Sequence, residues 1–122
     1  MFGKSEENSA REAEAERLCA LPVADLATEI MPVFGPGQPG SEVAIATGNV
    51  INYLLESYPG GPKRLSQLER PVREGLQMLE HAGLILVVPT DTYGGVLFVT
   101  RLGEKALAEG TVRRYLSDRG PV

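Results

Sequence analysis

Polar side chains able to make directional hydrogen bonds are concentrated in the segment RPVREGLQMLEH, residues 70–81. At the spacing of an α-helix this segment has an apolar face and an opposite polar face. The polar face carries Arg73, Glu74, Gln77 and His81. A guanidinium can form two hydrogen bonds to guanine, and a carboxamide can do the same with adenine. The chemistry that this face offers is therefore recognition through hydrogen bonds.

Residues suited to catalysis or metal binding are scarce. The chain has one cysteine, Cys19, and one histidine, His81, so it lacks the residues for an internal disulfide or a zinc cluster. The stretch GPGQPGS, residues 35–41, is not followed by the Gly-Lys-Ser/Thr of a phosphate-binding loop, and we expect it to be a connector. The sequence pattern shows no nucleophile with a base and no cofactor loop. We therefore expect no enzyme activity, no cofactor and no metal.

The charge of the chain is unevenly distributed. The 122 residues suit one domain with a single core, and their net charge is −4. Residues 1–58 carry three basic and nine acidic side chains, a net of −6, whereas residues 59–122 carry nine basic and seven acidic ones, a net of +2. Nucleic-acid binding depends on a local basic surface more than on the total charge. The sequence has neither a membrane-spanning apolar run nor a secretory signal, so we expect a cytoplasmic protein without membrane contact.

Two helices are expected before the connector. The segment ENSAREAEAERLCAL is rich in alanine and glutamate, which favour a solvated helix. A second helix is predicted over residues 22–35, because Pro22 suits a first helical turn. Its apolar residues share one face: Val23, Leu26, Ile30 and Phe34.

A central core helix is expected over residues 42–57, with Ser41 as its N-cap. The apolar stripe of this helix is Val43, Val50, Ile51, Leu54, Leu55 and Tyr58. A very short helix follows in RLSQLER, where Ser66 and Glu69 have the spacing of a capping box.

The helix at residues 71–82 is predicted to begin with Pro71 in its first turn and to stop at Gly83. Its apolar face comprises Val72, Leu76 and Leu79. The runs LILVV and VLFVT, separated by the turn-rich PTDTYGG, predict a β-hairpin. Thr100 is expected to cap a further helix over residues 101–110, followed by another helical turn or two.

Residues 43–109 resemble a winged helix-turn-helix domain of the MarR-, PadR- and ArsR-type bacterial transcription regulators. The segments that carry the resemblance are VINYLLESYP for the first core helix, RLSQLER for the second, PVREGLQMLEHAGLI for the third and VLFVTRLGEKAL at the close of the wing. The resemblance implies a mainly α fold with a β-hairpin wing and additional terminal helices. It divides the chain into an N-terminal helical extension and linker, residues 1–40, and a winged-helix domain with a C-terminal helix, residues 41–122.

The resemblance implies a transcriptional regulator that binds double-stranded DNA. In such domains the outward face of the third helix, here residues 71–82, reads bases in the major groove, while residues near its start hold phosphates. The DNA-binding residues implied in this sequence are Lys63, Arg64, Ser66, Gln67, Arg70, Arg73, Glu74, Gln77 and His81.

Two features favour the alternative of a winged-helix module that binds protein instead of DNA. Glu74 and Glu80 would repel phosphate, and the wing tip PTDTYGG has an acidic residue and no basic one. We also expect a homodimer joined through the N- and C-terminal helices, because these helices carry more apolar residues than a small core requires. In the alternative arrangement the N-terminal helices fold back and cover their own domain.

Overall fold

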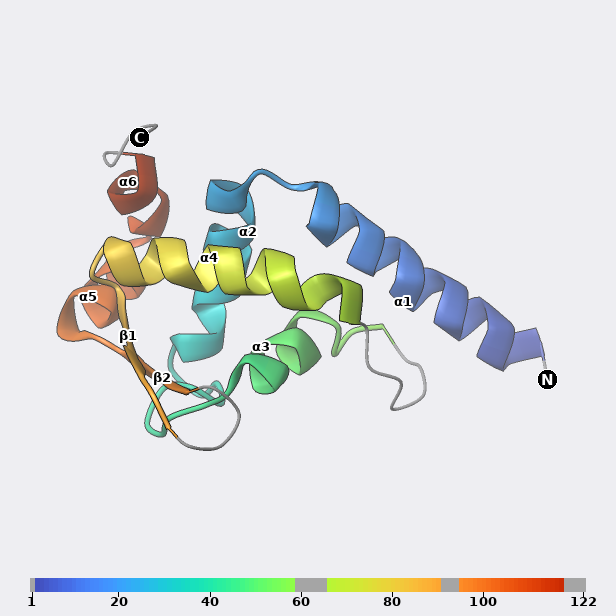
Figure 1. The fold of residues 1–122 in the computed structure, drawn as a ribbon, viewed down its shortest axis with the longest axis horizontal. Coiled ribbons are helices and arrows are strands. Elements are labelled where there is room, and N and C mark those ends of the chain that lie inside the picture. Colours follow the sequence, from blue (N-terminus) through green and yellow to red (C-terminus); the bar gives the residue numbers. More distant parts are fainter. Residues whose placement is uncertain (1, 59–65, 91–94, 118–122) are drawn as a thin grey trace.

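The structure, a computed structural model, is mainly helical with one two-stranded antiparallel hairpin. It describes residues 2–58, 66–90 and 95–117, and the side chains of residues 9–58, 66–90 and 95–116. The elements run in the order α1 (Phe2–Ala20), α2 (Val23–Ile30), η1 (Met31–Phe34), α3 (Thr47–Leu54), η2 (Ser66–Leu68), α4 (Glu69–His81), β1 (Ile85–Val88), β2 (Val96–Val99), α5 (Arg101–Glu109) and α6 (Val112–Ser117). This layout is compatible with a winged helix (Figure 1).

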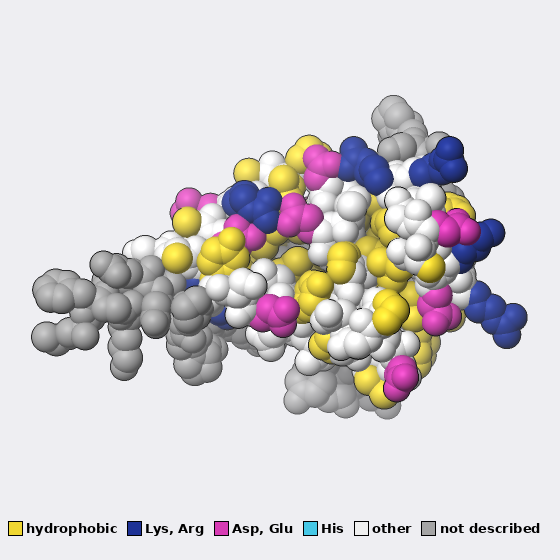
Figure 2. Space-filling model, turned by 180° about the vertical axis from the view of Figure 1, so that it is seen from behind, with side chains coloured by type: hydrophobic (Ala, Val, Ile, Leu, Met, Phe, Trp, Pro, Cys, Tyr) yellow, Lys and Arg dark blue, Asp and Glu magenta, His cyan; other side chains and the backbone are white. Residues whose placement is uncertain are grey.

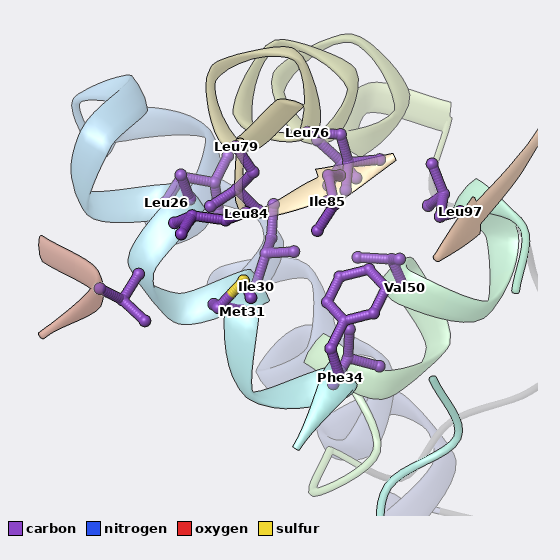
Figure 3. Packing of buried hydrophobic residues seen from close by; sticks show 14 of the residues in the cluster. Leu26, Ile30, Met31, Phe34, Val50, Leu76, Leu79, Leu84, Ile85 and Leu97 are labelled. Atoms are coloured by element: carbon purple, nitrogen blue, oxygen red, sulfur yellow. The ribbon is translucent and has the colours of Figure 1, made fainter. Parts of the chain in front are cut away.

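The core forms where α4 crosses α2 (Figure 1). The predicted apolar faces of both helices are buried there, apart from the partly exposed Val23, and Figure 3 shows their side chains converging. The hairpin adds Ile85 and Leu97 to the same cluster, and α3 adds Val50. Side chains from both sides of the predicted boundary at residues 40 and 41 therefore share one core, and the division into two parts stays a prediction.

The end of α4 is fixed by backbone hydrogen bonds around Gly83. The Gly83 amide donates to the Glu80 carbonyl at 2.9 Å, and the Leu84 amide donates to the Leu79 carbonyl at 3.0 Å. This is a Schellman motif, which requires the positive φ of 81° that Gly83 adopts. The predicted stop at Gly83 is confirmed, and the chain passes from α4 into β1 with only three residues between them.

Thr100 follows β2 at the base of the hairpin and joins it to α5. Its hydroxyl accepts a hydrogen bond from the Gly103 amide at 2.9 Å, which confirms the predicted N-cap. The same hydroxyl donates to the Gly83 carbonyl at 2.7 Å. One side chain thus holds the start of α5 against the end of α4.

The central core helix is shorter than predicted. α3 begins at Thr47, and Ser41 is not its N-cap. The reason is that Ile45 pairs with Leu97 of β2, with N···O distances of 3.1 and 2.8 Å, so the chain is extended just before the helix. Val43 consequently lies outside the helix and is 63% exposed, while Tyr58 lies beyond its end. The predicted burial of Val43 is wrong.

The very short helix predicted in RLSQLER is present over residues 66–68, and it continues directly into the next helix; Arg64 and Leu65 lie outside the described residues. Residues 66–68 form the single turn η2, and α4 begins immediately at Glu69. The predicted capping box between Ser66 and Glu69 is absent, because the N-cap of α4 is Leu68, which makes no side-chain cap. Leu68 is completely buried and anchors the start of α4. Pro71 lies in the first turn of α4, as predicted.

The terminal helices pack on the same chain. α2 contacts α6, where Val112 and Leu116 are buried and Arg113 forms an ion pair with Asp25. α1 projects from the body beyond the start of α4 (Figure 1), and its Arg11 guanidinium donates to the carbonyl of Tyr58 at 3.1 Å. This arrangement buries the apolar residues of α2 and α6 that prompted the dimer prediction. The dimer through these helices stays a prediction, and among the described side chains of α2 and α6 no exposed apolar stripe supports it.

Candidate interaction surface

The predicted recognition face of α4 is exposed to solvent. Arg70, Arg73, Glu74, Gln77 and His81 all lie on the outward side of the helix and are exposed. The structure therefore brings together these five predicted site residues on one helix.

The other predicted site residues lie before α4. Ser66 and Gln67 are exposed on η2. The Gln67 carbonyl accepts a hydrogen bond from the Cys19 thiol at 3.5 Å, which connects η2 to α1. Lys63 and Arg64 lie outside the described residues.

A hollow of about 150 Å³ separates α4 from the hairpin. Leu76, Val87 and Leu97 supply apolar lining, and the polar residues at the hollow are Thr47, Arg73, Gln77 and Glu80. Arg73 and Gln77 are one helical turn apart, so both side chains can reach a molecule that approaches this hollow. One positively charged side chain, Arg73, and one negatively charged side chain, Glu80, therefore line the hollow.

Charge on α4 is close to balanced. The helix carries two arginines, Arg70 and Arg73, and three glutamates, Glu69, Glu74 and Glu80. The Arg73 guanidinium lies 4.0 Å from the Glu69 carboxylate, one turn earlier. Because exposed carboxylates repel phosphate, this helix presents a weak electrostatic attraction to a nucleic-acid backbone.

The hairpin has a second candidate surface. Its inner face packs on the core through Ile85 and Leu97, which are buried, and Val87 and Val99, which pack against the cluster. The opposite face, here called the outer hairpin face, consists of Leu86, Val88, Val96 and Phe98.

The outer hairpin face is apolar and open to solvent. Leu86 is 56% exposed, Val88 42% and Phe98 39%, and Leu86 lies directly opposite Phe98 in the strand register. A hairpin that packs on a core through one face normally has polar residues on the other. Adjacent exposed side chains of this size are typical of a surface that another molecule covers.

The sequence signal for this surface is the absence of alternation in the two strands. In ILVV and VLFV every position is apolar, whereas a hairpin with one solvated face alternates apolar and polar residues. The predicted hairpin was correct, but its apolar outward residues were not among the predicted site residues. The missing period of two was the sequence signal that could have pointed to them, although a strand buried on both faces has the same pattern.

The part of the chain that the structure describes shows neither a group of side chains able to hold a metal ion nor a helix long and apolar enough to span a membrane. Partial burial and the Glu16 carboxylate raise the pKa of the Cys19 thiol. A raised pKa keeps this thiol protonated and weakens it as a nucleophile.

Comparisons of the chain with protein-family models, with curated proteins and with solved structures return no match. The likeness to winged-helix regulators therefore rests on the residue pattern and on the helix and hairpin layout.

Proposed function

We propose that this protein is a protein-interaction module of winged-helix layout, and that it contacts its partner through the outer hairpin face. The observation that carries the proposal is the exposure of Leu86, Val88 and Phe98 on strands whose other face is already buried. Burying such side chains releases about 25 cal/mol per Å² of apolar surface, so a partner protein would gain from covering them. A sugar-phosphate backbone is charged and hydrated, so it would not gain free energy by covering these apolar side chains.

The charge distribution supports a protein partner over DNA. α4 carries one more acidic than basic side chain, counting the histidine as neutral. On the face turned toward the viewer in Figure 2, Lys and Arg side chains alternate with acidic ones along the edge formed by α5 and α6. A duplex is bound mainly through a continuous basic surface that displaces counterions, and neither α4 nor this edge provides one.

The test is affinity capture from an extract of the source cells with three matched baits. The baits are the parent protein, Leu86→Lys on the outer hairpin face and Val43→Lys, which places the same charge at an exposed apolar residue outside that face. We expect the parent and Val43→Lys to retain the same partner and Leu86→Lys to lose it. Equal capture by all three baits would contradict the proposal.

A sequence-specific DNA-binding regulator is the second candidate function. It is favoured by Arg73 and Gln77, which are exposed one turn apart on α4 and chemically suited to guanine and adenine. Under this candidate, Arg73→Ala and Gln77→Ala would each weaken specific binding by about 1–3 kcal/mol without unfolding the protein. Gel-shift titration against its own promoter region at increasing salt would show binding that falls steeply with salt. Equal affinity of the parent and both variants for target and random duplex would reject it.

A further inference from the structure

The hollow between α4 and the hairpin has an apolar base. Leu76 of α4 and Leu97 of β2 are each 4% exposed, and the half-buried Val87 of β1 completes this base. The volume of the hollow is about 150 Å³, the size of an apolar protein cavity that holds one benzene molecule. It is well below the roughly 300 Å³ at which pockets for drug-sized molecules begin. The hollow therefore fits a single side chain of the size of leucine.

Three polar side chains of α4 follow one another along the rim of this hollow. Arg73, Gln77 and Glu80 are four and three residues apart, so they lie on one flank of the helix. The flank runs from a cation through an amide to an anion. Because the carboxamide of Gln77 has both donors and an acceptor, it can hydrogen-bond to groups of either charge. The rim therefore offers donors toward one end and acceptors toward the other.

The polar groups on this rim are available to a ligand. The Arg73 guanidinium lies 4.0 Å from the Glu69 carboxylate, which is too far for a hydrogen bond. Within the part of the chain that the structure describes, the side chains of Gln77 and Glu80 make neither a hydrogen bond nor an ion pair. Thr47, the first residue of α3, adds a hydroxyl to the lining. A molecule that enters the hollow thus meets donors and acceptors that no described residue uses.

We propose that this hollow binds a free α-amino acid with an aliphatic side chain of about the size of leucine. Its carboxylate accepts hydrogen bonds from Arg73 and from Nε2 of Gln77, since a guanidinium matches the two oxygens of a carboxylate. Its ammonium donates to the Glu80 carboxylate and to Oε1 of Gln77. Its side chain packs on the apolar base. The inference goes beyond the proposed function, because it concerns the inner side of the hairpin and not the outer hairpin face.

The charges of the rim select a zwitterion over other small molecules. The rim carries one positive and one negative side chain, and an amino acid carries one negative and one positive group, so every charge has a partner. A simple carboxylate or a phosphate would leave Glu80 without a cation, and the end of a peptide carries only one of the two charges. Arg73 and Glu80 are about 10 Å apart along the helix axis, and their long side chains can both reach a head group held beside Gln77.

The test is isothermal titration calorimetry of the full chain with L-leucine and with two analogues that each lack one charge. Leucinamide lacks the carboxylate, and 4-methylpentanoate lacks the ammonium. We expect leucine to bind at one site and both analogues to bind at least about tenfold more weakly, because each loses a charge-assisted pair. Absence of saturable leucine binding would overturn the proposal. Equal affinity for leucine and either analogue would also overturn it, since the missing charge would then have no role.

Two variants connect the binding to the rim. Arg73→Gln and Glu80→Gln should each weaken leucine binding at least about tenfold. Arg73→Gln should not weaken the binding of leucinamide, and Glu80→Gln should not weaken that of 4-methylpentanoate, because each analogue lacks the group with which the altered side chain pairs. Unchanged leucine affinity in either variant would overturn the assigned contact.

Arg70→Gln and Glu74→Gln are the matched controls, because they remove the same charges at exposed positions of α4 that do not line the hollow. Both should bind leucine with the affinity of the parent, and far-ultraviolet circular dichroism of all four variants should match the parent. Controls that lose leucine binding as strongly as the rim variants would overturn the site, since the effect would then follow the charge of the protein and not the hollow.

The proposed function and this inference fail separately. Leu86 does not line the hollow, so Leu86→Lys should bind leucine like the parent. A parent protein that binds leucine but captures no partner through the hairpin overturns the proposed function alone. A parent protein that captures a partner through the hairpin but does not bind leucine overturns the amino-acid site alone.

Discussion

Arg17 of α1 binds two carboxylates, that of Glu14 on its own helix and that of Glu29 on α2, and the second joins the two helices. Its guanidinium donates to both oxygens of Glu14, at 2.7 and 2.8 Å, and to both oxygens of Glu29, at 2.8 and 3.1 Å. The hydrogen bonds from Arg17 hold the pKa of Glu14 below its ordinary value. Paired and multiply bonded carboxylates of this kind make stability depend on pH.

We expect Glu14→Gln to flatten the acid side of the stability profile. A carboxylate whose folded pKa is lowered contributes stability above its unfolded pKa, and that contribution is lost as pH falls through the folded pKa. Urea unfolding from about pH 6 to about pH 3 should therefore show a smaller loss for Glu14→Gln than for the parent. Glu12→Gln, at an exposed position on the same helix, is the control and should follow the parent. Identical profiles for all three proteins would contradict the role of Glu14.

Leu79 is completely buried between α4 and α2 (Figure 3). Leu79→Ala should lower the free energy of unfolding by about 2–5 kcal/mol, because it removes apolar contacts and leaves a cavity. Gln77→Ala, on the exposed face of the same helix, should change it by no more than about 0.5 kcal/mol. Chemical denaturation of both variants measures the difference. Equal stabilities would show that the helical phase of α4 is wrong.

At the scale of elements, the closest approach is that of α5 to the base of the hairpin. A Cβ atom at Gly103 would overlap the Leu84 carbonyl oxygen and come within 2.9 Å of Val99 and 3.0 Å of Met31. Only glycine lets α5 lie at this distance from the backbone that leads into β1. The Gly83 turn and the α5 contact therefore both hold the base of the hairpin, at Leu84.

Two glycine substitutions in helices should have opposite effects. Gly103→Ala should destabilise the fold by about 1–3 kcal/mol through overpacking, although alanine favours a helix by about 1 kcal/mol. Gly48→Ala, in α3 with nothing within 4 Å of the added Cβ, should stabilise it by up to about 1 kcal/mol. Thermal and urea unfolding of the two variants provide the test. A gain in stability for Gly103→Ala would contradict the close packing of α5.

Elements that depend on local signals could be predicted from the sequence. The apolar periodicity of α4, the glycine at its end and the threonine before α5 act through neighbours within five residues, and all three predictions are confirmed. The start of α3 depends on the pairing of Ile45 with Leu97, more than fifty residues away, so a local pattern extended the helix too far. η2 runs directly into α4, and Leu68 at their junction is completely buried, which the local pattern does not reveal.

For the candidate site too, the sequence predicted what depends on local spacing and missed what depends on packing between elements. Helical spacing placed Arg73 and Gln77 on the exposed face correctly, because that depends on the phase of one helix. The position of Arg73 beside Glu69 and the hollow against Val87 require the hairpin to pack near α4. The apolar outward residues of the strands were present in the sequence, but only the packed inner face shows that they remain uncovered.

At the scale of the whole molecule, one core supports two outward surfaces of different chemistry. α4 presents mixed charges and the amide of Gln77, and the hairpin presents an apolar face. A single chain can satisfy the first surface with water, whereas the second gains free energy only when another molecule covers it. We propose that the outer hairpin face, rather than α4, is the functional surface for a macromolecular partner.

The most direct test is to compare Leu86→Lys and Arg73→Ala, each confirmed as folded, in one binding measurement against the captured partner and against duplex DNA. We expect Leu86→Lys to lose the protein partner and Arg73→Ala to keep it, and we expect neither the parent nor the variants to bind duplex specifically. Specific, salt-sensitive binding of duplex by the parent that Arg73→Ala abolishes and Leu86→Lys preserves would contradict this expectation.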